Sequence, residues 1–276
     1  MTALAFSPTR AGFLDQLRAD APALATLALF LLLSTVPTLA ALWLDDRTYQ
    51  ATPIWLKPLK FEISLFLYVA TLAYFARWIP EETRAGLPFR AFTVLVIACI
   101  LAEMAWIGAA AALGTGSHYN VATPVWAALY PIMGIVAITL TSASLVWGVL
   151  IWRNGETGLA APLHLSVALG LVLTFVLTVI AASVLAQGTG HFVGTPLPGD
   201  PRVPILGWSR TVGDLRVAHF LATHALQGLP LVGLVAAYLL PSETGRWFVW
   251  LSGLAYAALT FGLMAQALAG RPVFPA

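Results

Sequence analysis

The sequence predicts an all-α integral membrane protein, a seven-helix transmembrane bundle forming one domain over residues 1–276. Its mean hydropathy is +0.86 and only 9% of its residues are charged, against roughly 25% in a soluble domain. Runs of about 20 mostly apolar residues are long enough to cross a bilayer, and most connections between them are short. The predicted spans are Ala21–Leu44, Leu59–Ile79, Arg90–Leu113, Pro124–Trp152, Ala161–Gln187, Val217–Leu240 and Arg246–Ala269.

The first span is expected to be retained in the membrane. Arg10, Asp15, Arg18 and Asp20 precede it, and the apolar run is longer than the core of a cleaved signal peptide.

The second and third spans each carry a carboxylate. Glu62 follows Lys57 and Lys60, so an interfacial ion pair with a lysine is its simplest interpretation. Glu103 lies nearer the middle of its helix, where no nearby helical position offers a cation. An isolated charge is very unfavourable there, so Glu103 must be protonated, paired or facing water. It is a candidate ligand, proton relay or ion site, and a hydrogen-bonded structural acid is the alternative.

The connections after the first, third and fifth spans share a Thr-Pro pair: Thr52-Pro53, Thr123-Pro124 and Thr195-Pro196. Threonine is a favoured N-cap and proline a favoured first helical residue, which explains each pair by itself. Their nearly constant spacing on one face suggests three parallel helical hairpins plus a seventh helix.

The connection over residues 188–216 contains six glycines and four prolines. Unstructured loops of this length are uncommon and are often lids or binding segments. The sequence therefore predicts a long loop with a lid as its candidate role. At its end, Asp214 is expected to cap the sixth helix and Arg216 to extend toward lipid headgroups.

The sixth helix carries a broad polar stripe. His219, Thr223 and Gln227 follow each other at intervals of four residues, and His224 is about 60° from Gln227 around the axis. His224 is about 7 Å deeper than His219, so the two are not expected to ligate one small ion without help from other helices. Pro230 is expected to free the carbonyl of Leu226 for another partner or a kink.

Four of the five histidines fall at, or about one turn inside, the same ends of the predicted helices: His118, His191, His219 and His224. Imidazole is the commonest metal ligand and the usual axial ligand of b-type haem, and ionisable groups are costly at membrane depth. The sequence therefore predicts a site there. Glu62 and Glu103 are further candidate metal ligands, and Asp214, Arg216 and Gln227 are its candidate polar neighbours.

Several well-known types of site are excluded because the sequence lacks their motifs. The seventh span has no lysine for a retinal Schiff base, and no Cys-x-x-Cys-His occurs for covalent haem. Intramembrane zinc hydrolases of the ceramidase type pair two histidines four residues apart, whereas His219 and His224 are five apart.

The orientation follows only weakly from charge. Lysine and arginine number seven on each side, so the positive-inside rule does not decide. Three of those on the histidine side lie in the long loop, and the third connection has none. We therefore favour an inner amino terminus, and an outer carboxyl terminus and histidine face, periplasmic in a bacterium.

Several blocks together resemble a family of bacterial multi-pass inner-membrane proteins of no known activity. The resemblance covers most of the chain from the first connection to the sixth helix, and it implies an inner-membrane location and no reaction. The blocks are Trp55-Leu56-Lys57-Pro58-Leu59-Lys60-Phe61, Ser117-His118-Tyr119-Asn120, Gly207-Trp208-Ser209, Gly213-Asp214-Leu215-Arg216, His219-Phe220 and His224-Ala225-Leu226-Gln227.

Three functions fit this sequence. The leading hypothesis is a haem- or metal-binding membrane protein with a redox or sensing site, in which the four histidines hold haem b or a transition metal. The alternative is a small proton- or ion-coupled transporter or channel using Glu103. The third is a non-catalytic assembly partner in an envelope complex. The expected partners are the lipid bilayer and a redox or envelope protein, and the net charge of +2 gives no reason to expect nucleic acid. The haem or metal hypothesis and the transporter hypothesis differ in the surroundings they require for Glu103: the first needs it to face the histidines, and the second needs it to face a separate cavity.

Overall fold

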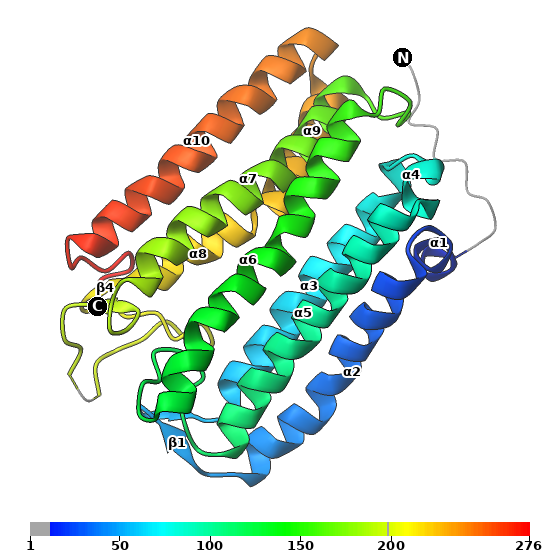
Figure 1. Cartoon of the computed structure of the whole chain (residues 1–276). Coiled ribbons are helices and arrows are strands. Elements are labelled where there is room, and N and C mark those ends of the chain that lie inside the picture. Colours follow the sequence, from blue (N-terminus) through cyan, green and yellow to red (C-terminus); the bar gives the residue numbers. More distant parts are fainter. Residues whose placement is uncertain (1–11, 198) are drawn as a thin grey trace.

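Long apolar helices run side by side through the computed structural model, which describes residues 12–197 and 199–276 (Figure 1). Within these residues six helices are long and apolar enough to cross a membrane, and the number is seven if the bent pair α8–α9 is counted as one span. This confirms the predicted all-α membrane bundle. The spanning elements are α2 (Pro22–Leu44), α3 (Leu56–Phe75), α5 (Leu87–Ala112), α6 (Pro124–Arg153), α7 (Ala161–Ala186), α8 (Leu215–Thr223) with α9 (Ala225–Leu239), and α10 (Ser242–Leu268).

Two short helices were not predicted, α1 (Phe13–Asp20) and α4 (Glu81–Ala85). Both lie at the end of the bundle away from β1 and β4 (Figure 1). Asp20 pairs there with Arg77, in the 3₁₀ turn η1 (Ala76–Trp78), and with Arg84 of α4, at 3.6 and 3.5 Å. These contacts fasten α1 to the segment that joins α3 to α5.

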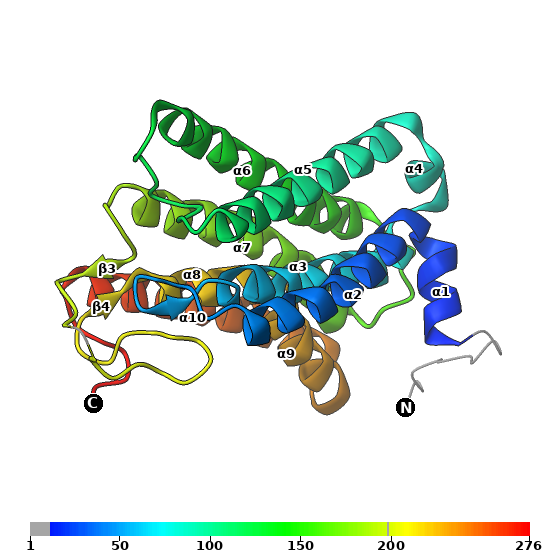
Figure 2. The ribbon, with the colours of Figure 1, turned by 90° about the horizontal axis from the view of Figure 1, so that it is seen from below.

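Consecutive helices pack as hairpins. α2 packs on α3, α5 on α6, and α7 on both α8 and α9, while α10 lies against α7, α8 and α9 (Figure 2). Only one Thr-Pro pair starts a helix: Thr123 Oγ1 accepts a hydrogen bond from the Trp126 amide and Pro124 is the first residue of α6. Thr52–Pro53 is instead strand β2, paired antiparallel with β1 (Thr48–Tyr49), and Thr195-Pro196 lies within a loop. The capping interpretation is therefore wrong for two of the three pairs.

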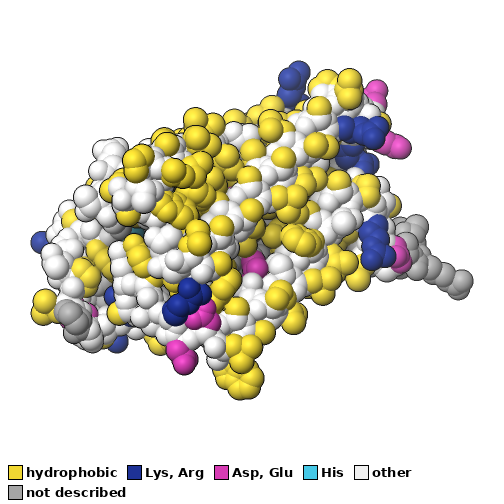
Figure 3. All heavy atoms as spheres, turned by 60° about the horizontal axis from the view of Figure 1, so that its bottom comes forward, with side chains coloured by type: hydrophobic (Ala, Val, Ile, Leu, Met, Phe, Trp, Pro, Cys, Tyr) yellow, Lys and Arg dark blue, Asp and Glu magenta, His cyan; other side chains and the backbone are white. Residues whose placement is uncertain are grey.

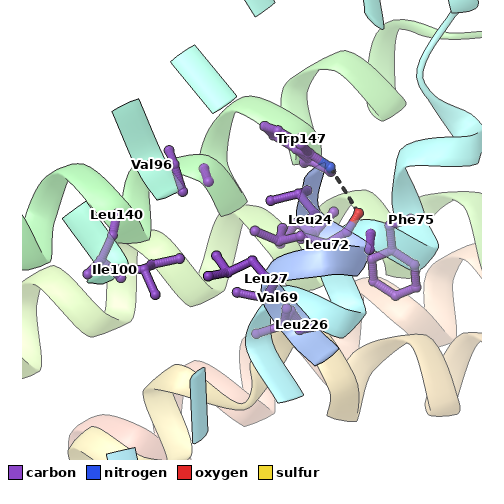
Figure 4. Packing of buried hydrophobic residues seen from close by; sticks show 14 of the residues in the cluster. Leu24, Leu27, Val69, Leu72, Phe75, Val96, Ile100, Leu140, Trp147 and Leu226 are labelled. Carbon is purple, nitrogen blue, oxygen red and sulfur yellow. Dashed lines mark hydrogen bonds between the residues drawn. The ribbon is translucent and has the colours of Figure 1, made fainter. Parts of the chain in front are cut away.

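The largest buried cluster takes side chains from six of the spanning elements, α2, α3, α5, α6, α7 and α9. Trp147 is its largest buried side chain, and its indole N–H donates to the Leu72 carbonyl at 3.1 Å (Figure 4). Small residues allow close helix contacts elsewhere: a Cβ on Gly233 of α9 would overlap the side chain of Ser166 in α7. The core thus lies at the centre of the bundle and leaves apolar side chains on its outside.

The seventh span is broken at His224, where the axes of α8 and α9 differ by 54°. The Leu226 amide donates to Thr174 Oγ1 of α7 at 2.8 Å instead of to a carbonyl of its own helix. Pro230 lies inside α9, so the break occurs six residues before the proline where a kink was expected. The predicted stripe of His219, Thr223 and Gln227 is consequently divided between two helices.

The connection after α7 is partly ordered by backbone pairing. Strand β3 (Phe192–Val193) pairs antiparallel with β4 (Gly213–Asp214), and a bridge joins Arg202 to Ser209. The loop is therefore closed at its base, next to the start of α8. Its role as a lid stays a prediction.

Hydrophobic side chains cover the length of the helices, and most acidic and basic side chains lie toward the two ends (Figure 3). Large apolar residues such as Phe30, Trp43 and Leu254 are more than half exposed. This distribution fits an integral membrane protein whose helices contact the lipid bilayer.

Candidate functional site

Three ionisable side chains from separate parts of the sequence meet at the end of the bundle that carries β1 and β4. Lys57 comes from the start of α3, Glu103 from α5, and His118 from the loop after α5. Lys57 Nζ lies 3.1 Å from His118 Nδ1, and His118 Nε2 lies 3.9 Å from Glu103 Oε1. Glu103 thus faces one of the predicted histidines, the arrangement expected for a haem or metal site, but the third member of the group is the Lys57 ammonium, which has no lone pair for a metal and carries protons instead. We call these three residues the relay cluster.

Local hydrogen bonds fix the loop that presents His118. The side-chain NH₂ of Asn120 donates to Thr115 Oγ1 and to the Gly116 carbonyl. Its side-chain oxygen accepts from the backbone N–H of Ala122. The indole of Trp106 donates to the Ser117 carbonyl at 2.8 Å. With both sides of His118 held in this way, its imidazole keeps a defined direction.

Two positions of the same loop require glycine, one for its backbone conformation and one for close packing. Gly114 has φ +73°, a left-handed conformation that favours glycine and turns the chain away from α5. A Cβ on Gly116 would lie 2.8 Å from the Tyr49 hydroxyl. The space beside Gly116 is therefore occupied by the Tyr49 side chain.

His118 is neutral across the physiological range. Burial, followed by the positive charge of Lys57 and the nearby His219, lowers the pKa of His118 to about 3. The Lys57 ammonium and the Ser117 hydroxyl both lie 3.1 Å from Nδ1, so Nδ1 accepts a hydrogen bond and the ring proton is on Nε2, toward Glu103. The 3.9 Å to Glu103 is longer than a hydrogen bond, and a side-chain shift of about 1 Å closes it.

Glu103 is only 4% exposed, and its Oε2 is buried without a hydrogen-bond partner. Leaving a carboxylate oxygen unsatisfied in an apolar interior is costly. Its functional interpretation is therefore favoured over that of a structural acid whose hydrogen bonds are all made.

Asp214 and Arg216 organise the neighbouring loop. Asp214 Oδ1 accepts from the Arg216 amide, which confirms Asp214 as the N-cap of α8. The Arg216 guanidinium binds both Asp214 oxygens and donates to the Gly207 carbonyl at 2.7 Å. The expectation that Arg216 extends to headgroups is wrong, because the loop offers it a carboxylate and a carbonyl. Lys60 donates a hydrogen bond to the carbonyl of Leu206, the residue before Gly207, and so joins α3 to this loop.

The other histidines differ in their surroundings. The His191 ring packs on Phe192, and burial together with the charge of Arg216 lowers its pKa to about 4. His219 Nδ1 is buried without a hydrogen-bond partner. His224, at the helix break, stacks on Phe220 and its Nδ1 lies 2.7 Å from that residue's carbonyl. His219 acts on His118 electrostatically, whereas the Nδ1 atom of His224 is engaged locally.

Two predicted site residues have partners outside the relay cluster. Glu62 Oε1 accepts from Thr38 Oγ1 at 2.7 Å, so the expected ion pair with a lysine is wrong. Lys57 and Lys60 are directed instead to His118 and the Leu206 carbonyl. Gln227 donates to Thr71 Oγ1 at 3.2 Å.

A protein metal site needs several donor side chains in one place. Among residues 12–197 and 199–276, no three His, Cys, Asp or Glu side chains are grouped so that they could hold one. Both nitrogens of His118 face other groups of the protein. A metal or haem at this place stays a proposal.

Sequence reasoning missed Lys57 as a site residue and considered it only as a partner for Glu62. The available signal was its position at the start of a span with two lysines and one carboxylate, which leaves at least one cation to be satisfied elsewhere. Comparisons with protein-family models, curated protein sequences and solved structures give no match.

Proposed function

We propose that this chain is a proton-translocating membrane protein in which the relay cluster passes protons between one face of the membrane and the bundle interior. The observation that supports it is the position of the His118 imidazole between an ammonium and a carboxylate, 3.1 Å from Lys57 Nζ and 3.9 Å from Glu103 Oε1. Imidazole is suited to this role because it binds a proton on one nitrogen and releases another from the opposite one.

The transfer balances within the three groups. The Lys57 ammonium gives a proton to His118 Nδ1 while the proton on Nε2 passes to the ionised Glu103 carboxylate. Lys57 becomes a neutral amine, His118 remains neutral in its other tautomer, and Glu103 becomes a carboxylic acid. A proton from the aqueous face then restores Lys57, Glu103 passes its proton on to the bundle interior, and reorientation of the His118 side chain brings its protonated nitrogen back toward Glu103 before the next transfer. The low pKa of His118 fits a transfer in which the imidazole exchanges one proton for another and stays neutral throughout.

The proposed setting is a bacterial cytoplasmic membrane with the amino terminus inside and the relay cluster near the outer face. This orientation rests on the distribution of basic residues over the connections, including the absence of lysine and arginine from residues 114–123. Protons then enter the relay cluster from the outer side.

Proton uptake by reconstituted vesicles tests the proposal. Liposomes loaded with a pH-sensitive dye receive the purified chain, and a potassium diffusion potential drives protons inward. Wild-type vesicles are expected to acidify faster than protein-free vesicles, and Glu103→Gln and His118→Leu to return the rate to the protein-free level. Glu243→Gln is the matched control, because Glu243 is 77% exposed at the far end of α10. Equal rates for wild type and protein-free vesicles, or for wild type and Glu103→Gln, overturn the proposal.

A second proposal retains haem b or a transition metal, with His219 as a ligand of the metal or iron. The observation that favours it is the buried His219 Nδ1 without a hydrogen-bond partner. Absorption spectra of oxidised and dithionite-reduced protein, with elemental analysis, test it. A Soret band or stoichiometric metal that disappears in His219→Ala supports it, and colourless, metal-free protein after haem and metal supplementation overturns it.

A further inference from the structure

A cavity of about 380 Å³ lies between α2, α3 and α5. Its walls are mainly apolar and include Phe30, Leu31, Leu101 and Met104. Phe30 and Leu101 are 53% and 41% exposed on the outside of the bundle, so the cavity opens toward the lipid. This volume is in the range of small-molecule sites, roughly 300–1,000 Å³.

One carboxylate lines this apolar cavity. Glu62 is 4% exposed; its Oε1 accepts from Thr38, and its Oε2 is buried without a hydrogen-bond partner. Among the part of the chain that the structure describes, no lysine, arginine or histidine nitrogen lies within ion-pair distance of Glu62. A carboxylate with a free acceptor oxygen in an apolar setting is costly unless a cation or a proton neutralises it.

The form of the cavity selects among cations. Ser34, Thr38 and Glu62 offer oxygen donors from three side chains, too few for a metal ion that needs about six ligands. Trp55 also lines the cavity, and its indole N–H is held by Asp45 Oδ2 at 2.7 Å. Its fixed ring gives a cation a second favourable contact. The remaining walls are hydrocarbon and suit an alkyl chain.

The positions of the cavity residues along α2 and α3 fit a ligand with a charged head and an apolar chain. Glu62 is six residues into α3, about 9 Å from its first residue, and Leu31 is seven residues from Thr38, about 10 Å farther along α2. A cationic head at Glu62 therefore lies just inside the membrane surface, while its chain runs toward the middle of the bilayer.

We infer that this cavity is a binding site for single-chain lipophilic amines, with the ammonium paired to Glu62 and the alkyl chain between Phe30, Leu101 and Met104. The inference does not rest on the relay cluster, whose carboxylate Glu103 is absent from the cavity lining.

Equilibrium binding of radiolabelled dodecylamine to the full chain in phosphatidylcholine nanodiscs tests the inference. Glu62→Gln keeps an oxygen that accepts from Thr38 but loses the charge, and it is expected to weaken dodecylamine binding about 10- to 100-fold. Dodecanol, with the same chain and no charge, is expected to bind more weakly than dodecylamine and to be insensitive to Glu62→Gln. Glu243→Gln, which removes an exposed carboxylate at the far end of α10, is the matched control and is expected to leave dodecylamine binding unchanged.

A second variant tests the place of binding independently of charge. Gly108 lines the cavity, and a Cβ built on it meets no atom within 4 Å, so Gly108→Leu extends into the cavity without disturbing the helix. It is expected to abolish dodecylamine binding while the thermal unfolding temperature stays near that of the wild type. Equal dodecylamine binding by wild type and Glu62→Gln, by wild type and a folded Gly108→Leu, or equal affinity for dodecanol and dodecylamine, overturns the inference. These outcomes are independent of the proton-uptake result, which depends on Glu103.

Discussion

Asp214 holds Arg216 by both carboxylate oxygens at the start of α8. Nε lies 2.9 Å from Oδ1 and Nη2 lies 2.6 Å from Oδ2, and Asp214 is 1% exposed. Only Asp214 is buried, and Asp214→Ala leaves the Arg216 guanidinium, whose side chain is 30% exposed, without its partner, so we expect a cost of about 1–3 kcal/mol in unfolding free energy. Thermal unfolding in detergent measures this. The exposed pair Arg246–Glu243 is the control, and Glu243→Ala is expected to cost no more than about 1 kcal/mol. Similar losses in both variants contradict the expectation.

The contact of α9 with α7 depends on the absence of a side chain at Gly233. A Cβ there would overlap the Ser166 side chain, so Gly233→Ala is expected to destabilise the protein by about 1–3 kcal/mol. In Gly262→Ala of α10 the new Cβ meets no atom within 4 Å, and the better helix propensity of alanine makes it neutral or slightly stabilising. Unfolding temperatures of the two variants measure the difference, and an equal change in both argues against the close contact.

The break at His224 depends on a hydroxyl of the neighbouring helix. Thr174→Val keeps the shape but leaves the buried Leu226 amide without its acceptor, at an expected cost of about 1–3 kcal/mol. Thr139→Val serves as the control, because the Thr139 hydroxyl only donates to the Ile135 carbonyl of its own helix. Hydrogen exchange at the Leu226 amide provides the measurement, with faster exchange expected in Thr174→Val alone. Unchanged protection contradicts this role of Thr174.

A lower pH is expected to destabilise the end of the bundle that carries the relay cluster. The pKa of His118 is lowered to about 3 and that of His191 to about 4 from an ordinary value of 6.5. Below about pH 6.5 the unfolded chain therefore binds protons that the folded chain does not, and stability falls as the pH decreases toward those lowered pKa values. Each histidine contributes a slope of up to about 1.4 kcal/mol per pH unit.

Unfolding temperatures measured from about pH 7.5 down to about pH 4.5 test this dependence. Lys57, Glu103 and His219 surround His118, so the matched pair is His118→Gln and His191→Gln, which are each expected to flatten the pH dependence. A slope that is the same in wild type and both variants shows that neither imidazole is held neutral by folding.

The sequence was sufficient to predict the number and approximate limits of the spans, because a run of apolar residues is a local property that can be seen directly in the chain. The N-cap Asp214 was also predictable, since its partner is the amide of Arg216 two residues later. Lys57 and His118 are 61 residues apart, and their contact depends on how α3 packs beside the loop after α5. No periodicity in the sequence contains that information.

The position of the break in the seventh span could not be predicted for the same reason. Pro230 is the local signal, but the bend occurs at His224, where Thr174 from α7 accepts a hydrogen bond from the Leu226 amide. Likewise Glu62 and its nearby lysines suggested an ion pair, whereas α2 supplies Thr38 as the partner. Contacts between helices decided each of these cases.

The interruption between α8 and α9 has an electrostatic consequence. Each half-helix carries its own macrodipole, so the negative carboxyl end of α8 and the positive amino end of α9 meet at His224, about 14 Å along the helix from the first residue of α8, not at the ends of the bundle. The backbone thereby places partial charges of opposite sign at a depth where ionisable side chains are expensive. A straight helix through the same position would present the bilayer interior with no such field.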